Sequence, residues 1–307
     1  MAEAYESVNA DKAARLRDCA IRLSFIETKA ADLAPEVLAM LQKRKKKEIK
    51  MLRKLAGAWF CKVRLCPMCS WRRSLKVAAQ MRKIMDAIQA EQPKAYILLT
   101  LTMRNCSPDE LDAEITRYLK AFNLMTKHKD FKAAVCGYYR TMEITHNLAD
   151  GTFHPHIHAI LAVDKSYFSS CNYLSQKKWT SLWKRAAGLN YDPSVDVRRV
   201  KGNTAKAVAE TAKYAVKSSD YIIPNDWDLT VATVKLLDKV LHNRRFIAFG
   251  GIFKDYHKKL NLDDAEDGDL IHVDPDEKPP EPEAENVVHY LWYSGYRQYF
   301  RDISDPL

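Results

Sequence analysis

Three histidines occupy alternate positions in the stretch HPHIH, residues 154 to 158, and they are the side chains best suited to hold a metal ion. Residues i, i+2 and i+4 of a strand point to the same face, so His154, His156 and His158 are expected to lie in a row. The apolar run AILAV follows directly and predicts a buried strand that holds the row rigid. Two neutral imidazoles at this spacing can bind one divalent cation from the same side.

The third ligand is expected on the preceding strand, YRTMEITHN, because the turn sequence LADG folds the two strands into a hairpin. That hairpin brings Glu143 beside His156 and His158. One carboxylate with two imidazoles suits Mn²⁺ or Mg²⁺ and leaves coordination positions open for phosphate oxygens. His154 is then a fourth ligand, a group that supports the ligands, or an exposed residue. The competing interpretation, that the histidines only make hydrogen bonds, is less favoured for such a run beside a carboxylate.

A tyrosine and a glutamate share one face of an expected helix over residues 203–222, because Glu210 and Tyr214 are four residues apart. A phenol with a pKa of about 10 is a poor nucleophile at neutral pH. The neighbouring Lys213 and Lys217 favour its ionised form, and Glu210 is placed to act as a general base for Tyr214 or for water. Such a pair more often only packs on the helix surface and has no catalytic role. Its position after the histidine strand favours the catalytic interpretation.

Cys61, Cys66 and Cys69 form the pattern C-x4-C-x2-C. In a reducing cytosol, thiolates at this spacing indicate a structural Zn²⁺ site rather than disulfides. Three cysteines leave a tetrahedral site one ligand short, and spacing alone does not identify the fourth. The basic residues expected to contact DNA phosphates are Arg64, Arg72 and Arg73 beside this motif, and Lys217.

The charge distribution indicates a polyanion as partner. The 307-residue chain has a net charge of +10, but residues 263–285 contain eleven acidic residues and one lysine. The remainder carries 48 basic and 28 acidic residues, as nucleic-acid-binding proteins often do. The polar N-terminal stretch and the lack of a long apolar run predict a cytoplasmic protein with no membrane partner.

The order of the expected elements predicts an α+β fold with a largely antiparallel central sheet flanked by helices. The elements are a strand at 94–103, a helix at 107–128, strands at 134–147 and 152–163, a helix near 173–187, a strand at 195–200 and the helix at 203–222. Residues 11–56 place Leu, Ile, Phe and Met at helical spacing and are expected to be helical. Four regions follow: a helical, zinc-stapled DNA-binding region at 1–92, a catalytic domain at 93–260, an acidic flexible linker at 261–286 and an aromatic segment at 287–307. That last segment either docks on the body or contacts a partner or DNA bases.

The chain resembles the rolling-circle plasmid replication initiators of the HUH endonuclease superfamily. The resemblance is carried by ILLTLTMRNC, HPHIHAIL and ETAKYAVK, in that order, and by the cysteine motif FCKVRLCPMCSWRRS upstream. It covers roughly residues 15–220 and implies an HUH-type sheet with a single nucleophilic tyrosine. It also supports Cys19 as the fourth zinc ligand.

By this resemblance, Tyr214 attacks origin DNA, single-stranded or extruded as a hairpin, at the plasmid's double-strand origin. The attack forms a 5′-phosphotyrosine and frees a 3′-hydroxyl that primes synthesis, with the host helicase and polymerase as further partners. The metal held by His156 and His158 polarises the phosphate, and Glu210 activates water at termination. Tyr221, seven residues after Tyr214, is the lesser candidate for a second nucleophile.

Two alternatives remain open. A relaxase or single-strand transposase would use the same chemistry for mobilisation, and genetic context would distinguish it. A non-catalytic zinc protein that binds nucleic acid would carry the histidine strand for structural reasons alone, and a cleavage assay on single-stranded DNA with Mn²⁺ would separate it.

Overall fold

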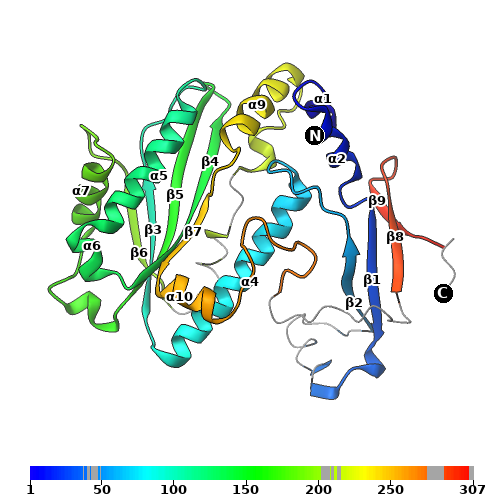
Figure 1. Ribbon diagram of the computed structural model, residues 1–307, viewed down its shortest axis with the longest axis horizontal. Helices are drawn as coiled ribbons and strands as arrows, with labels where there is room; N and C mark the ends of the chain where they lie inside the picture. Colours follow the sequence, from blue (N-terminus) through cyan, green and yellow to red (C-terminus); the bar gives the residue numbers. More distant parts are fainter. Residues whose placement is uncertain are drawn as a thin grey trace.

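The structure is a computed structural model with two antiparallel sheets and helices packed around the larger one (Figure 1). It describes residues 1–36, 38–39, 42, 48, 50–201, 208, 211–212, 216–274 and 287–303. The predicted α+β class, with a central antiparallel sheet flanked by helices, is confirmed.

The larger sheet has five antiparallel strands. In spatial order they are β6 (Val195–Arg199), β3 (Ala95–Thr102), β5 (Thr152–Val163), β4 (Gly137–Asn147) and β7 (Ile247–Gly251). The three central strands are rich in Ile, Leu, Val and Tyr, which suit a pleated sheet buried on both faces. The strands predicted at 94–103, 134–147, 152–163 and 195–200 are therefore all present.

Alternating residues of these strands build two separate cores. One core lies under α5 (Leu111–Lys127), α6 (Lys129–Ala134), α7 (Gln176–Ala186) and α9 (Trp227–Val240). The other lies under α4 (Pro67–Glu91) and α10 (Ile252–Lys259), where Leu98, Tyr139 and Ile160 meet Met81 of α4 and Phe253 of α10. Figure 1 shows α5 and α4 on opposite sides of the sheet. On the α4 face, the sheet positions that α4 and α10 do not cover can therefore carry the polar side chains of a site.

The remaining elements are short. They are the helices α1 (Ala2–Glu6) and α2 (Ala10–Asp18), and the 3-10 helices η1 (Ala30–Asp32), η2 (Lys165–Ser169) and η3 (Ser218–Asp220). Helix α1 packs on α9 through the buried Tyr5, whose hydroxyl donates to Asp238 at 2.7 Å. No helix in the part of the chain that the structure describes is both long and apolar enough to cross a bilayer.

The smaller sheet corrects one prediction. The helix expected over residues 11–56 ends at Asp18, and β1 (Arg22–Lys29) and β2 (Met51–Ala58) follow it. They pair with β8 (Val287–Tyr293) and β9 (Gln298–Arg301) in the order β2-β1-β8-β9. Strand β1 lies between β2 and β8, so its backbone groups are satisfied by a segment at the other end of the chain. The aromatic C-terminal segment therefore docks on the body through β1, and its contact with a partner or DNA bases remains a prediction.

The acidic segment differs from the expected flexible linker where it is described. Residues 263–274 pack along α4 and β7, and Glu266 is only 3% exposed. Lys76 of α4 donates to the Asp263 carboxylate at 2.5 Å and to the Asp269 carbonyl at 2.9 Å. Specific hydrogen bonds order this stretch, although it has no large apolar surface to bury. The rest of the predicted linker, 275–286, lies outside the described residues.

Candidate metal centre and catalytic site

The β4–β5 hairpin aligns the predicted metal ligands side by side. The register pairs Glu143 with His156 and Thr141 with His158, and directly paired residues point to the same face. On that face of β5, Ile160 belongs to the core under α4, and His158 and His156 are the next two positions toward the end of the hairpin. The alternation that buries the apolar positions therefore also brings the histidines to the edge of that core.

The ligand atoms of the three residues converge. Nε2 of His156 lies 3.3 Å and Nε2 of His158 lies 3.4 Å from the same carboxylate oxygen, Oε2 of Glu143. Adjacent ligands bound at about 2.1 Å in octahedral geometry lie roughly 3 Å apart, so this spacing fits one hard divalent cation. The predicted set of Glu143, His156 and His158 is thus brought together.

The other ring nitrogens already have partners that orient the imidazoles. Nδ1 of His156 donates to the backbone carbonyl of His154 at 3.1 Å. Nδ1 of His158 lies 3.1 Å from the Thr100 hydroxyl on β3. A metal ligand needs the tautomer with the proton on Nδ1 and the lone pair on Nε2, and both of these Nδ1 contacts are compatible with it.

Glu143 is kept ionised in a buried position. Burial raises the pKa of Glu143, but hydrogen bonds from His156, His158 and Lys217 outweigh it and hold that pKa far below the ordinary value. Lys217 Nζ lies 2.8 Å from Oε1, and this contact raises the pKa of Lys217. A negative carboxylate and neutral imidazoles are the protonation states that bind a cation. Lys217 contacts the candidate metal-binding carboxylate, and its predicted contact with DNA remains a prediction.

His154 stands apart from the converging group. Its ring lies 5.5 Å from that of His156. Burial lowers the pKa of His154, and the neighbouring His156 lowers it further. Its Nε2 is buried and has no hydrogen-bond partner among the described residues. The choice between a fourth ligand and a supporting group therefore stays open for His154.

The predicted catalytic residues Glu210, Lys213 and Tyr214 lie outside the described residues, but residues on both sides of them are placed. Before them, the Thr211 carbonyl accepts from the Tyr139 hydroxyl at 3.2 Å. After them, Lys217 reaches Glu143. Tyr221, the lesser candidate for a nucleophile, is buried and donates its hydroxyl to the Leu65 carbonyl at 2.8 Å.

The second cluster consists of the four predicted cysteines. Sγ of Cys19 lies 3.6 Å from Cys69 and 3.5 Å from Cys66, and Cys61 lies 3.6 Å from Cys69. Four sulfurs bound at about 2.3 Å around a tetrahedral Zn²⁺ are roughly 3.8 Å apart, so the cluster fits that ion. Helix α4 begins at Pro67, so Cys66 caps it and Cys69 lies in its first turn, where the helix dipole favours thiolates. The other three cysteines, Cys106, Cys136 and Cys171, belong to no such group among the described residues.

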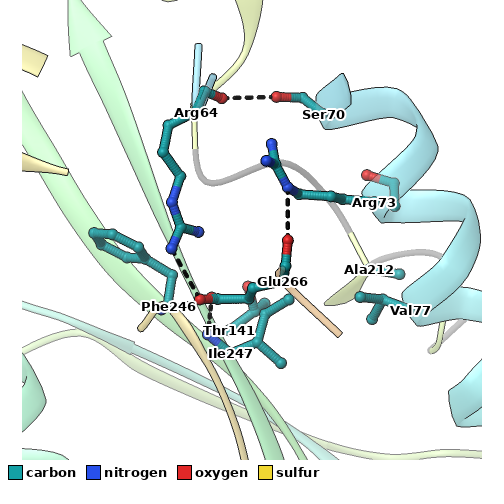
Figure 2. A pocket seen from close by; sticks show the side chains of 10 residues that line it. Arg64, Ser70, Arg73, Val77, Thr141, Ala212, Phe246, Ile247 and Glu266 are labelled. Carbon is teal, nitrogen blue, oxygen red and sulfur yellow. Dashed lines mark hydrogen bonds and ion pairs between the residues drawn. The ribbon is translucent and has the colours of Figure 1, made fainter. Parts of the chain in front are cut away.

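The arginines beside the cysteines contact the acidic segment, and their contact with DNA phosphates remains a prediction. The acidic segment occupies them, and Figure 2 shows Glu266 between Arg64 and Arg73. Arg64 donates to the Glu266 carboxylate at 3.1 Å, and the buried Arg73 donates to the Glu266 carbonyl at 2.9 Å. Arg72 donates to the carbonyls of Leu270 and Ile271. These guanidinium groups attach the acidic segment to α4.

Sequence reasoning missed the support that Thr100 gives to His158. The available signal was ILLTLTM, in which Thr100 and Thr102 interrupt an apolar strand at alternate positions. Thr102 faces the same side, but its hydroxyl donates to the Ser194 carbonyl at 2.9 Å. Two polar side chains in a buried strand indicate a polar site on one face.

Comparison with known proteins identifies the family. A family model described as "Replication protein" matches residues 52–300. The chain belongs to the replication protein family. A protein named "Protein rep" from Bacillus amyloliquefaciens is 38% identical over 97% of this chain and 90% of its own length. Two more of that name, from a Bacillus species and from Lactiplantibacillus plantarum, are each 40% identical, over 89% and 80% of this chain and 91% and 81% of theirs. No solved structure matches the chain.

The match to this replication family spans both clusters except Cys19. It includes Cys61, Cys66 and Cys69, all three converging ligands of the β4–β5 hairpin, and the small-sheet strands β8 and, to Phe300, β9. The similarity to the first of these relatives covers nearly the whole chain.

Proposed function

We propose that this replication protein initiates rolling-circle replication of a plasmid by nicking and rejoining one DNA strand at the double-strand origin. The observation that carries the proposal is the convergence of Glu143, His156 and His158, with Lys217 bound to the same carboxylate. Membership of the replication protein family favours replication over mobilisation by a relaxase or transposase.

The site is suited to a phosphodiester. A Mn²⁺ or Mg²⁺ ion held by the three ligands would withdraw charge from a phosphate oxygen and expose phosphorus to attack. Thr100 and the His154 carbonyl keep the histidines aimed, and Lys217 adds a positive charge beside the position that a phosphate would take. His154 is a further ligand in this proposal if its buried Nε2 turns toward the ion.

Tyr214 is the proposed nucleophile. Its oxygen loses a proton and bonds to phosphorus as the bond from phosphorus to the 3′-oxygen breaks. The products are a 5′-phosphotyrosine and, once the leaving 3′-oxygen has taken up a proton, a 3′-hydroxyl. Lys213 is proposed to stabilise the phenolate, and Glu210 to act as a general base that activates water at termination. The support is the placement of Thr211 and Lys217, three residues on either side of Tyr214, on the metal-binding face.

The proposed zinc site is structural. The Cys19, Cys61, Cys66 and Cys69 sulfurs complete a tetrahedron among themselves and leave no position for a substrate. Zinc there would join the end of α2 to the start of α4, so that α4 is fixed over the catalytic face of the sheet. Origin DNA is the proposed substrate, and the host helicase and polymerase are the proposed later partners.

The test is covalent attachment to a labelled single-stranded origin oligonucleotide in the presence of Mn²⁺. Tyr214→Phe removes only the attacking oxygen, so it is expected to abolish the adduct seen on denaturing gels and to leave oligonucleotide binding within about twofold of wild type. Glu210→Ala is the matched control from the same segment, and it is expected to keep the adduct and to impair release. An adduct that persists in Tyr214→Phe would show that another residue is the nucleophile.

A further inference from the structure

The β8–β9 hairpin exposes an unusual number of large aromatic side chains. Trp292 is 39% exposed, Tyr293 49%, Tyr296 75% and Phe300 41%. Large rings are normally buried because their area contributes strongly to the hydrophobic effect. Four exposed rings within nine residues therefore indicate a contact surface rather than scattered exposure.

The rings are distributed over both faces of the small sheet. On one face, Tyr293 packs edge-on against Phe300 with ring centroids 5.4 Å apart. On the other face, Trp292 lies 4.9 Å from Tyr299. Among the described residues, neither hydrophobic core includes any residue of β1, β2, β8 or β9. The hairpin projects at the edge of the molecule beyond β1 (Figure 1).

The charge of this surface is positive. Residues 287–301 contain no Asp or Glu, and they carry Arg297 in the turn and Arg301 on β9. The four strands together contain one acidic residue, Glu27, which accepts from Arg53 at 2.6 Å. Their basic residues are Arg22, Lys29, Arg53, Lys54 and Arg301.

The aromatic surface continues toward the cysteine cluster. The Tyr299 hydroxyl donates to the Ala20 carbonyl at 2.6 Å, and the Ala20 amide donates to the Trp59 carbonyl at 2.8 Å. Trp59 is 49% exposed, although it is next to the buried cysteine pocket. Ala20 thus contacts both the hairpin and the backbone of Trp59, a residue whose ring is exposed.

We propose that the β8–β9 hairpin is a binding site for single-stranded DNA, separate from the metal centre. The exposed rings stack on unpaired bases, and Arg297 and Arg301 contact phosphates. Bases in a duplex have their faces covered by neighbours, so a platform of exposed rings selects unpaired strands. The inference draws on the proposed function for one point only, that initiation at an origin generates unpaired DNA.

A protein partner is the competing occupant, because Tyr, Trp and Arg are also enriched at protein interfaces. The acid-free hairpin and the basic strands beside it favour a polyanion. A second copy of this chain would bring an identical positive surface against the first, which is electrostatically unfavourable.

The experiment measures binding of a fluorescent oligo-dT by anisotropy, with the full chain and no added Mn²⁺ or Mg²⁺. The variant Trp292→Ala/Tyr296→Ala removes two exposed rings, one of which lies in the turn. Each lost stacking contact is expected to weaken binding about tenfold, while binding to a duplex of equal length stays within about twofold. Arg297→Gln and Arg301→Gln are each expected to reduce the slope of log K against log salt by about 0.7.

The matched control is Trp227→Ala. Trp227 is 51% exposed on α9 and lies between Asp226 and Asp228, so it should not contribute to binding of a polyanion. Unchanged oligo-dT affinity in the double variant, or an equal loss for duplex, would overturn the proposal. A shift of the double variant to a smaller species in sedimentation, with oligo-dT affinity unchanged, would assign the surface to self-association instead.

A second measurement covers the case in which the double variant does not fold. Photocrosslinking of wild-type protein to an iodouracil-substituted single strand is expected to label a peptide within 287–303, and labelling confined to other peptides would contradict the proposal. Neither readout involves strand cleavage. A failure of the proposed nicking chemistry would therefore leave both results unaffected.

Discussion

At the scale of single residues, the candidate metal centre depends on the groups that hydrogen-bond to the ligands as much as on the ligands themselves. Thr100 and the His154 carbonyl fix the two imidazoles, and Lys217 holds the other oxygen of Glu143. Such partners orient a ligand and raise its basicity, and their loss commonly reduces metal affinity about 10- to 100-fold. The geometry of this site should accordingly be sensitive to a residue that never contacts the ion.

Thr100→Val tests that point, because valine has nearly the shape of threonine and lacks the hydroxyl. The concentration of Mn²⁺ that gives half-maximal cleavage is expected to rise about 10- to 100-fold, since His158 loses the hydroxyl that orients its ring.

The matched control for Thr100→Val is Thr102→Val, on the same strand and face, whose hydroxyl bonds to Ser194 and not to a histidine. Equal Mn²⁺ requirements in the two variants would show that the Thr100 contact does not tune the site. Thr100→Ser should restore the wild-type requirement.

At the scale of elements, the acidic segment attaches α4 to β7. The Glu266 carboxylate accepts from the backbone amides of Phe246 and Ile247 at 2.7 and 2.8 Å and from Arg64 at 3.1 Å. Strand β7 is an edge strand, so these bonds satisfy amides at its start. Removing one partner of a buried network leaves the others unsatisfied, which is costly.

Glu266→Gln is expected to lower the free energy of unfolding by about 1–3 kcal/mol, because the charge opposite Arg64 is lost and one oxygen is replaced by a donor. Thermal unfolding followed by circular dichroism measures the change. Asp267→Asn, at the exposed neighbouring position, is the control and should stay within about 0.5 kcal/mol of wild type. Identical shifts in both variants would contradict the structural role of Glu266.

An element could be predicted where the sequence pattern that indicates it lies within one short stretch of the chain. Strand β5 and its histidines were predictable because period-two alternation, a turn sequence and an apolar run all lie within one stretch, and the β4–β5 pairing followed from that turn. Strand β1 was not, because its partner β8 lies at the other end of the chain. Glu266 was missed because a buried carboxylate in an acidic run has the composition of a linker. Its partners Arg73 on α4 and Ile247 on β7 come close to it only in the folded chain.

At the scale of the whole molecule, the chain forms a large sheet with two cores and a small sheet that contributes to neither among the described residues. The small sheet is made from both ends of the chain. The parts meet at the cysteine cluster, where Cys19 follows α2 and the other three cysteines lead into α4. We propose that the small sheet and the five-stranded domain respond separately to truncation.

Ending the chain at Asp274 tests this separation. Strands β1 and β2 would then form a two-stranded ribbon, which is marginally stable alone. Hydrogen exchange is expected to speed up in 22–29 and 51–58 and to stay unchanged in β3, β4 and β5. A general loss of protection in the five-stranded sheet would show that the two parts unfold as one.

The pairing of β1 with β8 also sets an order in time. Ser24 and His289, whose side chains meet at 2.8 Å, are separated by 265 residues. At about 5–20 residues per second, β1 waits roughly 13–50 s during synthesis before its partner leaves the ribosome. Before that interval ends, the cysteine cluster and then the β4–β5 hairpin have been synthesised and can fold, whereas the aromatic hairpin does not yet exist. A nascent chain therefore acquires the proposed metal ligands before the proposed DNA-binding surface, and the two proposed functions come together only in the finished protein.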